Sequence, residues 1–496
     1  MNKKAGVLYP IFSLPGKYGI GSFGAEARQA ADGLAKAGFS VWQVLPLTPT
    51  GYGDSPYQSE CGYAGNPYFI DLETLKHDGL LTAEELKSAE RPNARYIDYG
   101  DLYRTRFALL YKAYERFEKG AAFAEFSKKP GLFDYALYVA IKKENGSRPW
   151  YEWAEPYRLR EPSALAQFAF SHEKEIGFYL FLQYEFDLQW NALKSYVNGK
   201  GILILGDLPL YLSRDSVEVW TKPELFQLNG DGTPTSVAGV PPDYFSKTGQ
   251  LWGNPLYDWE AQKKDGYAWW QERIRSNLRL YDMLRIDHFR GIDRYWSVPF
   301  GEETAVNGAW KEGPKTALFA GFENAPIVAE DLGASDESLL KFLKEAGYPG
   351  MRVTSFMFGG DVDNPHLPSN FVEKSVVYTG THDNQPFSEL LKEESGEALN
   401  RTVEILQKEG ALLGVEVQKA QTAEYYTEKM CEILLRSRAD LAILPFFDLL
   451  PEKTGLRVNE PGDSSGKNWT VRLLEGELSE KRLCAFGELP KTRGNN

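Results

Sequence analysis

Short apolar runs that recur along this 496-residue chain constrain its fold more than any other feature. Each run is short enough for a buried parallel strand, and segments with helical periodicity separate the runs. This alternation of strands and helices predicts a parallel sheet in an α/β fold. An eighth strand, expected in the long early segment, would favour a (β/α)8 TIM barrel over an open doubly wound sheet. Seven runs are clear: 39–47, 201–212, 283–289, 326–333, 350–358, 375–383 and 439–447.

A long segment between the first two runs predicts an insertion. More than a hundred residues separate these runs, which is far more than one crossover helix needs. Helical periodicity marks much of this segment, for example residues 104–120 and 177–197. We therefore expect a single catalytic domain over 1–496, with a mainly helical subdomain inserted at approximately 55–195.

The stretch 227–257 differs in composition from the rest of the chain. Gly, Pro, Asn and Asp are frequent there, and aromatic residues are interleaved with them. Turn-forming residues at this density predict an extended loop, and loops of this length in a compact domain commonly carry function. We expect 227–257 to be a long active-site loop.

Composition restricts the partners and the cellular location. Lys and Arg number 56 against 69 Asp and Glu, so the formal net charge is −13. Such a field opposes binding to nucleic acid and to anionic membranes, and it favours a neutral or cationic small molecule as substrate. Pro10 and Pro15 interrupt the apolar stretch near the N-terminus, and no run approaches a membrane-spanning length. Three widely spaced cysteines, Cys61, Cys431 and Cys484, argue against a disulfide framework and predict a cytoplasmic protein.

Four of the strand candidates end in a carboxylate. The acids are Asp207, Asp287, Glu330 and Asp383. The carboxyl ends of parallel barrel strands form one rim, so these side chains are expected to converge from distant positions in the chain. Glycosidic chemistry uses converging acids, because one attacks or stabilises the anomeric carbon while a second protonates the departing oxygen. Helix capping explains any one of these acids alone. It does not readily explain four acids at equivalent positions of four different strands.

Two neighbours of these acids strengthen the interpretation. Arg285 lies two residues before Asp287, so both side chains point to the same side of the strand. A guanidinium there would keep Asp287 ionised, as a nucleophile requires, although a purely structural ion pair explains the spacing as well. His382 directly precedes Asp383 and has the chemistry to donate a hydrogen bond to a sugar hydroxyl.

Aromatic residues on polar segments indicate a carbohydrate ligand. Pyranose rings stack their apolar faces on aromatic planes, while polar edges bind the hydroxyl groups. Rings interleaved with Gly, Ser, Asp and Asn are better suited to binding such a ligand than to packing in a dry core. The rings in question are Tyr52, Tyr57, Tyr244, Phe245, Trp252 and Tyr257.

Three motifs that indicate other functions are rejected. GIGSFG (19–24) matches a dinucleotide fingerprint, but no strand leads into it and no acid ends a second strand at the expected distance. GDSSG (462–466) matches a nucleophile elbow, yet it follows Pro461 in a polar loop. DVDN (361–364) has too few ligands for a calcium loop. We therefore expect neither a metal nor an organic cofactor.

Ten specific motifs follow one another along nearly the whole chain, and their order makes an accidental match very improbable. They are SLPGKYGIGSFG, GYGDSPYQS, AGNPYFIDL, GDLPLYL, PPDYFSKTGQLWGNPLY, LRIDHFRG, VAEDLG, YTGTHDN, RVNEPG and NWTVR. Together they resemble the amylomaltases, also called 4-α-glucanotransferases or disproportionating enzymes, which are members of the α-amylase clan.

The resemblance implies a retaining, double-displacement mechanism. In this mechanism Asp287 is the nucleophile, Glu330 is the general acid/base, and Asp383 grips the sugar at the cleavage site. The stretch 241–257 would line the acceptor channel. The implied substrate contacts are Tyr57, Asp207, Asp243, Trp252, Arg285 and His382.

One segment departs from the pattern of the amylomaltases. GDSSGKNW, which follows RVNEPG, lacks the expected threonine and is slightly longer than the usual form. The difference bears on the shape of that loop and on any contact from Asn459. The three catalytic acids are unaffected.

The expected function is the transfer of a segment of an α-1,4-glucan or maltooligosaccharide to a 4-hydroxyl of glucose or another glucan. An α-glucan hydrolase shares this chemistry until water replaces the sugar acceptor. Maltotriose separates the two, since transfer yields glucose plus longer oligomers whereas hydrolysis yields only shorter ones. The alternative from another functional class is a non-catalytic glucan-binding barrel. The three candidate catalytic acids argue against it, because a binding protein needs no nucleophile.

Overall fold

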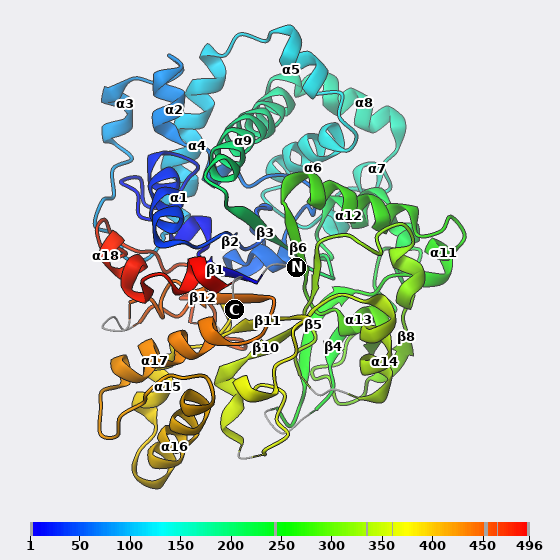
Figure 1. Cartoon of the computed structure of the whole chain (residues 1–496). Coiled ribbons are helices and arrows are strands. Elements are labelled where there is room, and N and C mark those ends of the chain that lie inside the picture. Colours follow the sequence, from blue (N-terminus) through cyan, green and yellow to red (C-terminus); the bar gives the residue numbers. More distant parts are fainter. Residues whose placement is uncertain are drawn as a thin grey trace.

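Eight parallel strands close into a barrel at the centre of the molecule (Figure 1). The computed structural model describes residues 3–242, 246–333, 336–359, 361–450, 455–463 and 465–493. The closed barrel confirms the predicted (β/α)8 class. Around it the strands follow the order β1 (Lys4–Leu8), β12 (Leu441–Pro445), β11 (Ser375–Tyr378), β10 (Gly350–Val353), β9 (Ile327–Ala329), β6 (Met283–Ile286), β3 (Leu203–Leu208) and β2 (Val41–Gln43).

The barrel strands form from apolar runs that are buried on both faces, as parallel strands between helices require. Every residue of β11 and β12 is buried, and each of the seven predicted runs contains one barrel strand. The eighth strand differs from the expectation, because it is β1 at the very start of the chain. Its run is five residues long and contains Ala5 and Gly6, so its apolar signal is weak. Gly6 packs closely on β2, where a Cβ would lie 2.8 Å from the carbonyl oxygen of Val41.

Amphipathic helices surround the barrel and precede successive strands. In α14, for example, Leu339 and Phe342 are buried, while Asp336 caps the first turn by accepting a hydrogen bond from the backbone of Leu339. Gly347 ends this helix in the left-handed conformation, with φ of 72°. The helices of this kind are α1 (Ala25–Ala37), α9 (Glu173–Gly199), α12 (Ala268–Leu280), α14 (Glu337–Ala346) and α17 (Ala423–Arg436).

A group of helices between β2 and β3 lies on one side of the barrel (Figure 1). The long helix α9 packs against α4 and α6 of this group and then leads into β3. The segment is helical, as its periodicity predicts. The other members are α2 (Leu72–His77), α3 (Ala83–Lys87), α4 (Tyr99–Arg116), α5 (Ala121–Phe126), α6 (Leu132–Glu144), α7 (Glu155–Arg158) and α8 (Pro162–Ser171).

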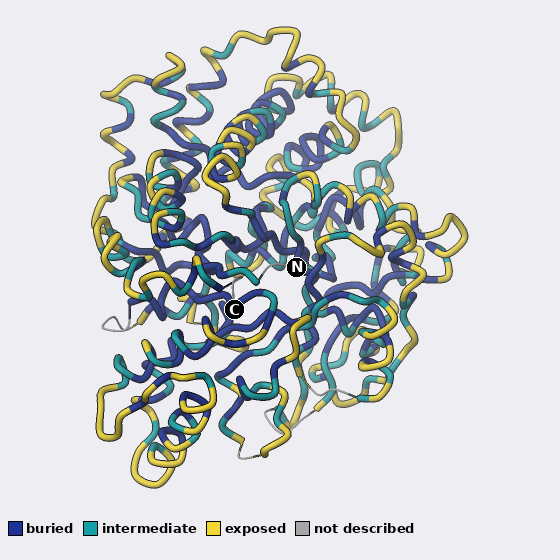
Figure 2. Tube along the Cα trace, viewed as in Figure 1, coloured by how far each residue is buried: buried dark blue, intermediate teal, exposed yellow. Residues whose placement is uncertain are grey.

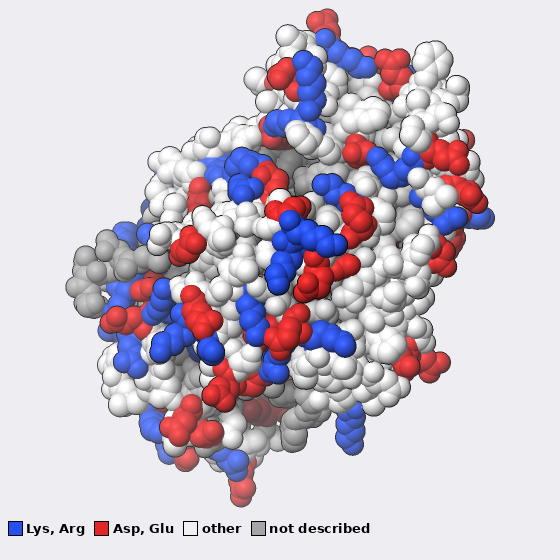
Figure 3. Space-filling model, turned by 90° about the vertical axis from the view of Figure 1, so that its right-hand side faces the viewer, with Lys and Arg blue, Asp and Glu red and all other residues white. Residues whose placement is uncertain are grey.

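The remaining helices lie in connections and near the C-terminus. Buried residues follow the barrel strands, and exposed residues lie mainly on the outer helices and loops (Figure 2). Basic and acidic side chains are interspersed on the face shown in Figure 3. Within the described ranges, no helix combines the length and apolarity needed to cross a membrane. The remaining helices are α10 (Val217–Thr221), α11 (Trp259–Lys263), α13 (Arg290–Asp293), α15 (Phe387–Glu393), α16 (Gly396–Leu412), α18 (Glu480–Leu483) and α19 (Leu489–Thr492).

A second, antiparallel sheet occupies much of the stretch 227–257 that was expected to be an extended loop. Its strands follow the order β5 (Gln250–Pro255), β4 (Ser236–Val240), β7 (Arg294–Pro299) and β8 (Ala309–Glu312). Val237 of β4 packs against Val298 of β7 and Ala305 in a small apolar cluster. Because these partners are distant in sequence, the local Gly and Pro content gave no sign of them. We refer to β4 and β5 together as the β4–β5 hairpin (236–240 and 250–255).

The side chain of Arg472 joins three distant segments of the chain. It is fully buried and donates hydrogen bonds to the backbone carbonyls of Gly16, Arg91 and Ala94. Burial lowers the pKa of Arg472 to about 10, so the guanidinium remains protonated at neutral pH. Arg472 therefore connects the C-terminal region to the N-terminal loop and to the helices inserted after β2.

Replacing Arg472 with alanine is expected to lower the midpoint of thermal unfolding. A buried carbonyl that loses its donor costs about 1–3 kcal/mol, and for a chain of this length a loss of this size corresponds to a shift of about 1–3 °C. The matched control is Arg104→Ala, because the Arg104 side chain is 71% exposed. Calorimetry or dye-monitored unfolding of both variants measures the difference. Equal midpoints for the two variants would contradict the structural role of Arg472.

Candidate active site

The carboxyl ends of the barrel strands bring three of the four predicted acids to one rim. Asp207 lies in β3, Asp287 directly follows β6, and Glu330 directly follows β9. The backbone N–H groups of Asp287 and Glu330 donate to carbonyls at the ends of β3 and β6, at 3.0 and 3.1 Å. The hydrogen-bond ladder of the barrel therefore fixes the backbone of both acids. The prediction that Asp383 ends a strand is wrong, because β11 ends at Tyr378 and Asp383 lies in the loop between β11 and α15.

Arg285 connects two of these acids through one guanidinium. The register of β3 and β6 places Arg285 opposite Asp207. Its Nη1 donates to both carboxylate oxygens of Asp207, at 2.8 and 2.6 Å, and its Nη2 donates to Oδ1 of Asp287 at 2.8 Å. The contact confirms the prediction that Arg285 and Asp287 point to the same side of their strand. The guanidinium therefore holds Oδ1 of Asp287 in place.

Burial differs between the two carboxylates that Arg285 binds. The Asp207 side chain is inaccessible, whereas that of Asp287 is 28% exposed and can meet a ligand. Burial lowers the pKa of Arg285, but the charges of Asp207 and Asp287 outweigh it and raise this pKa well above its usual value. Asp207 therefore anchors the guanidinium, and Asp287 presents a free edge to the solvent side of the rim.

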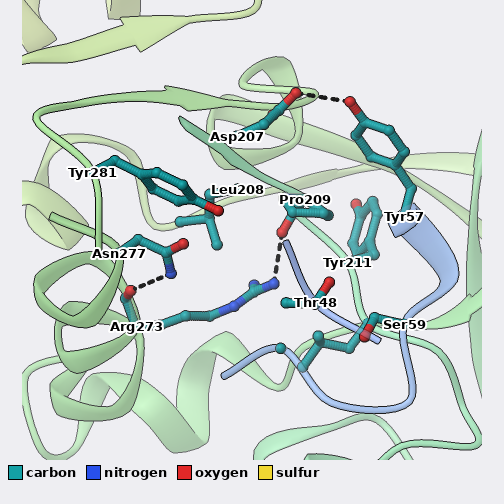
Figure 4. Close-up of a pocket in the computed structure, with 12 residues that line it drawn as sticks. Thr48, Tyr57, Ser59, Asp207, Leu208, Pro209, Tyr211, Arg273, Asn277 and Tyr281 are labelled. Carbon is teal, nitrogen blue, oxygen red and sulfur yellow. Dashed lines mark hydrogen bonds between the residues drawn. The ribbon is translucent and has the colours of Figure 1, made fainter. Parts of the chain in front are cut away.

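Tyr57 reaches Asp207 from the loop that follows β2. Its hydroxyl donates to Oδ2 of Asp207 at 2.7 Å, as drawn in Figure 4. The same ring stacks on the imidazole of His382, with centroids 5.1 Å apart and an interplanar angle of 14°. Trp469 lies beside both rings, at 5.5 and 5.7 Å. The structure therefore brings Tyr57, Asp207 and His382 together, three of the residues predicted as substrate contacts.

A small pocket opens beside this contact (Figure 4). Arg273, one of its lining residues, donates to the carbonyls of Pro209 and Leu210. Asn277 in turn donates to the carbonyl of Arg273. Arg273 thereby fixes the chain directly after Asp207.

Asp383 is held by residues on both sides of it. Nδ2 of Asn459 donates to Oδ1 of Asp383 at 2.6 Å, and Nε2 of His382 lies 3.3 Å from the same oxygen. Arg457 donates to the backbone carbonyl of Asp383 at 3.1 Å. The Asp383 side chain is nevertheless 41% exposed, so one carboxylate oxygen can receive hydroxyl groups of a ligand. The contact from Asn459 is present even though the following GDSSGKNW segment departs from the family pattern.

Glu330 has the most perturbed environment of the three predicted catalytic acids. Its two oxygens accept hydrogen bonds from the backbone N–H groups of His288, at 2.8 Å, and Leu332, at 2.7 Å. Burial raises the pKa of Glu330 to about 7, and the negative charge of Asp287 adds to this effect, while Arg285 and the two backbone donors oppose it. At neutral pH Glu330 can therefore both give and accept a proton.

The β4–β5 hairpin reaches this rim through Trp252. The edge of its indole contacts the His288 imidazole, with ring centroids 4.7 Å apart and an interplanar angle of 83°. Tyr211 lies 6.2 Å from both rings. Trp252 is half-buried, so part of its ring is available to a ligand.

The predictions for Tyr257 and for residues 243–245 need comment. Tyr257 is buried, and its hydroxyl donates to the carbonyl of Leu210, so it belongs to the core and does not face a ligand. Sequence reasoning misplaced it because the surrounding Gly, Pro and Asn suggested a mobile loop. Asp243, a predicted substrate contact, lies outside the described residues, together with Tyr244 and Phe245.

His288 is a site residue that sequence reasoning missed. It directly follows Asp287, and its backbone has a φ of 48°, a left-handed conformation that is uncommon for residues other than glycine. This residue donates its N–H to Glu330 and packs its ring against Trp252. Burial lowers the pKa of its imidazole to about 4, so the ring is neutral at neutral pH. Its position directly after Asp287, an acid at the end of a strand, is the sequence feature from which His288 could have been predicted.

The arrangement can perform displacement chemistry at a carbon that carries a leaving oxygen. The site contains the accessible carboxylate of Asp287 beside the Arg285 guanidinium, together with Glu330, whose pKa is raised to about 7. Such a pair supplies a nucleophile and a general acid/base. In the part of the chain that the structure describes, no group of three or more His, Cys, Asp or Glu side chains is arranged to hold a metal ion.

Known proteins with similar sequences share one description. A family model for Glyco_hydro_77, described as 4-alpha-glucanotransferase, matches residues 9–477. The chain is 42% identical over 486 residues to a 4-alpha-glucanotransferase of Clostridium butyricum, covering 95% of this chain and 97% of that protein. It is 41% identical over 500 residues to the 4-alpha-glucanotransferase of Thermus thermophilus, covering 97% and 98% of the two chains.

A comparison with solved structures agrees with the sequence relatives. The structure resembles the amylomaltase from Streptococcus agalactiae in complex with acarbose, with a TM-score of 0.92 and 36% identity over 100% of this chain and 99% of that one. The amylomaltase from Corynebacterium glutamicum, at 19% identity and a TM-score of 0.80, shares the fold. With a family model that matches almost the full length and relatives above 40% identity, this chain belongs to the 4-alpha-glucanotransferase family.

Proposed function

We propose that this protein transfers a segment of an α-1,4-glucan to the 4-hydroxyl of glucose or of another α-1,4-glucan, through a glucosyl ester on Asp287. The observation that carries this proposal is the contact of Arg285 with Asp287 beside Glu330, whose pKa is about 7. Membership of the 4-alpha-glucanotransferase family supports the same reaction. Maltooligosaccharides are the proposed donors, and the reaction needs no cofactor.

In the first step Oδ of Asp287 attacks the anomeric carbon of the donor. The bond between this carbon and the departing glycosidic oxygen breaks, and Glu330 gives its proton to that oxygen. The products are a glycosyl ester of Asp287 and a released glucan with a new 4-hydroxyl. Arg285 stabilises the carboxylate before the attack, and the backbone donors of His288 and Leu332 hold the Glu330 carboxyl in place.

In the second step the roles of Glu330 reverse. Its carboxylate removes the proton from the 4-hydroxyl of the acceptor, and that oxygen attacks the anomeric carbon from the face the first product left. The ester bond to Asp287 breaks and the carboxylate is restored. Two inversions at one carbon retain the α configuration. A pKa near neutrality suits Glu330 to both directions of proton transfer.

The residues around Asp287 and Glu330 are proposed to bind the sugar. Asp383 and His382 would grip hydroxyl groups of the sugar at the cleavage site, which stabilises its distorted ring. Tyr57, Asp207 and Arg285 would form the wall of the same subsite, and their mutual hydrogen bonds support this role. Trp252 and Asp243 are assigned to the acceptor channel.

The proposal extends to the domain organisation, cellular location and partners of the protein. We assign 1–496 to one catalytic domain with an insertion at approximately 55–195, and 227–257 to the acceptor side of the site. The enzyme is assigned to the cytoplasm, which its three unpaired cysteines favour. No nucleic acid or membrane partner is proposed.

Incubation with maltotriose tests the proposed reaction against its alternatives. Transfer yields glucose together with maltotetraose, maltopentaose and longer chains, which chromatography resolves. A hydrolase would yield only glucose and maltose, and a glucan-binding protein would leave maltotriose unchanged. Either of these two results would overturn the proposal.

The variant Asp287→Asn is expected to lose transfer activity while keeping its fold. Because an amide cannot form the ester, kcat should fall by on the order of 10⁴-fold or more. Product release from maltotriose and the thermal unfolding midpoint are measured together. The control is Asp78→Asn, since the Asp78 side chain is 52% exposed and lies between α2 and α3, among the helices inserted after β2. Activity of Asp287→Asn above a few per cent would assign the nucleophile to another acid.

The dependence of kcat/KM on pH is expected to report Glu330. Its pKa is raised to about 7, so the protonated form that the first step requires is present below that pH and is lost above it. We expect kcat/KM to fall about tenfold per pH unit on the alkaline side. Initial rates between pH 5 and pH 9 measure this limb. The limb should disappear in Glu330→Gln, and its persistence in that variant would assign it to a different group.

The variant Trp252→Ala is expected to raise the ratio of hydrolysis to transfer. Water and sugar compete for the same ester, and a sugar wins only where the site orders the acceptor and excludes water. Trp252 contacts His288 beside both catalytic acids, which places it where an acceptor would lie. Glucose release and chain lengthening are quantified in one incubation. A parallel fall of both rates would show that the hairpin supports the fold and does not select the acceptor.

A further inference from the structure

The loop that carries His382 and Asp383 has little regular structure of its own. It begins after β11 and ends where α15 starts at Phe387. Within it, Asn384 accepts hydrogen bonds from the backbone and hydroxyl of Thr381. We call residues 379–387 the Asp383 loop.

A buried carboxylate binds both ends of the Asp383 loop. Asp448, three residues after β12, accepts a hydrogen bond from the hydroxyl of Thr379 and one from the backbone N–H of Phe387, the latter at 2.8 Å. The two donors bind different oxygens of Asp448, so one side chain closes the base of the loop. The carbonyl of Thr379 also accepts from the backbone of Ser355 at 3.1 Å, which connects this base to the segment after β10.

Asp448 is costly to bury, which indicates a specific role. Its exposure is 1%, and both of its partners are neutral groups. Among the described residues we find no lysine, arginine or histidine paired with it. Burial raises the pKa of Asp448 to about 6, while the two hydrogen bonds oppose this shift. An apolar side chain would fill the space at lower cost, but it would bind neither end of the loop.

The middle of the loop is bound by a different segment. Asn459 donates its backbone N–H to the carbonyl of His382 at 3.0 Å and its side chain to Asp383. Asn459 therefore holds Asp383 directly, while Asp448 binds the two ends of the loop that carries it. Removing the contacts of Asp448 would free the loop to move relative to Asp287 and Glu330, which the barrel ladder fixes independently.

We infer that Asp448 is a positioning residue for the reaction, which sets the place of Asp383 by closing the base of its loop. This inference rests on the proposed role of Asp383 in gripping the sugar. Asp448 touches no substrate. Its effect on rate passes through Asp383, because a displacement of about 1 Å in a positioned group can cost on the order of 100-fold in rate.

The test compares Asp448 with a matched carboxylate elsewhere in the fold. Glu409 has the same burial of 1% and likewise accepts from a backbone N–H and a hydroxyl, both of Ser369. Both of these contacts lie in the short turn before Phe371, outside the Asp383 loop. Asp448→Asn and Glu409→Gln each remove one charge and replace one acceptor with a donor, so both should lower the unfolding midpoint.

Steady-state transfer from maltotriose separates the two sites. We expect Asp448→Asn to lower kcat/KM between about 10-fold and 100-fold, mainly through kcat, and Glu409→Gln to change it less than about twofold. Should Asp448→Asn fail to fold, Thr379→Val removes only the hydroxyl donor and should lower kcat in the same direction. Its control is Ser369→Ala. Equal effects of the Asp448 and Glu409 variants on kcat/KM would overturn the inference.

A double-variant cycle tests whether Asp448 acts through Asp383. In the Asp383→Asn background, adding Asp448→Asn should change kcat/KM less than about threefold, because the group being positioned is already lost. A full multiplication of the two effects would overturn the inference alone and leave the proposed function intact. Unchanged activity of Asp383→Asn by itself would overturn the proposed role of Asp383, and with it this inference.

Discussion

The contact of one Arg285 nitrogen, Nη1, with both carboxylate oxygens of Asp207 is the interaction on which the rest of the site depends. Both side chains are almost completely buried, and ions in such a place are stable only when their partners and geometry are complete. The register of β3 and β6 supplies this geometry, and Tyr57 supplies a third hydrogen bond. The guanidinium is thereby fixed before any ligand binds, and its second nitrogen holds Asp287 at the rim.

The site is assembled from barrel strand ends, a loop and a second sheet. Asp287 and Glu330 follow barrel strands directly, so the backbone ladder fixes them. Asp383 lies in a loop and needs partners on two sides, Asn459 and, at the base of the loop, Asp448. Trp252 belongs to a second sheet that reaches the rim through its contact with His288. The acids proposed to form and break bonds thus lie directly after barrel strands, while the residues proposed to bind ligands lie in a loop and in the second sheet.

Much of this arrangement follows from local sequence. A buried strand and the acid that ends it are encoded by adjacent residues, so the runs around Asp207, Asp287 and Glu330 could be predicted together with their convergence at one rim. The pairing of Arg285 with Asp287 followed from the alternation of side chains along a strand. The aromatic and polar residues near Tyr57 and Trp252 indicated a sugar ligand for the same local reasons.

The parts that escaped prediction depend on contacts between distant residues. The run of β1 is short and contains a glycine needed only because β2 packs against it. The pairing of β4 with β7 joins segments far apart in the chain, and Tyr257 is buried by that arrangement. His288 and Asp448 act through backbone groups of other segments, which no local pattern reveals. Strands and the acids that follow them are thus encoded by local sequence, whereas these contacts form only when distant segments meet in the folded chain.

The central claim is that Asp287 forms a covalent ester with the sugar, and mass spectrometry tests it most directly. The variant Glu330→Gln is incubated with α-maltosyl fluoride, whose leaving group needs no acid and whose ester then lacks a base for the second step. Digestion and fragmentation of the peptide containing residues 283–289 locates any adduct. The account predicts one maltosyl group on Asp287. A maltosyl group on another carboxylate, or fluoride release with no adduct at any time, would contradict it.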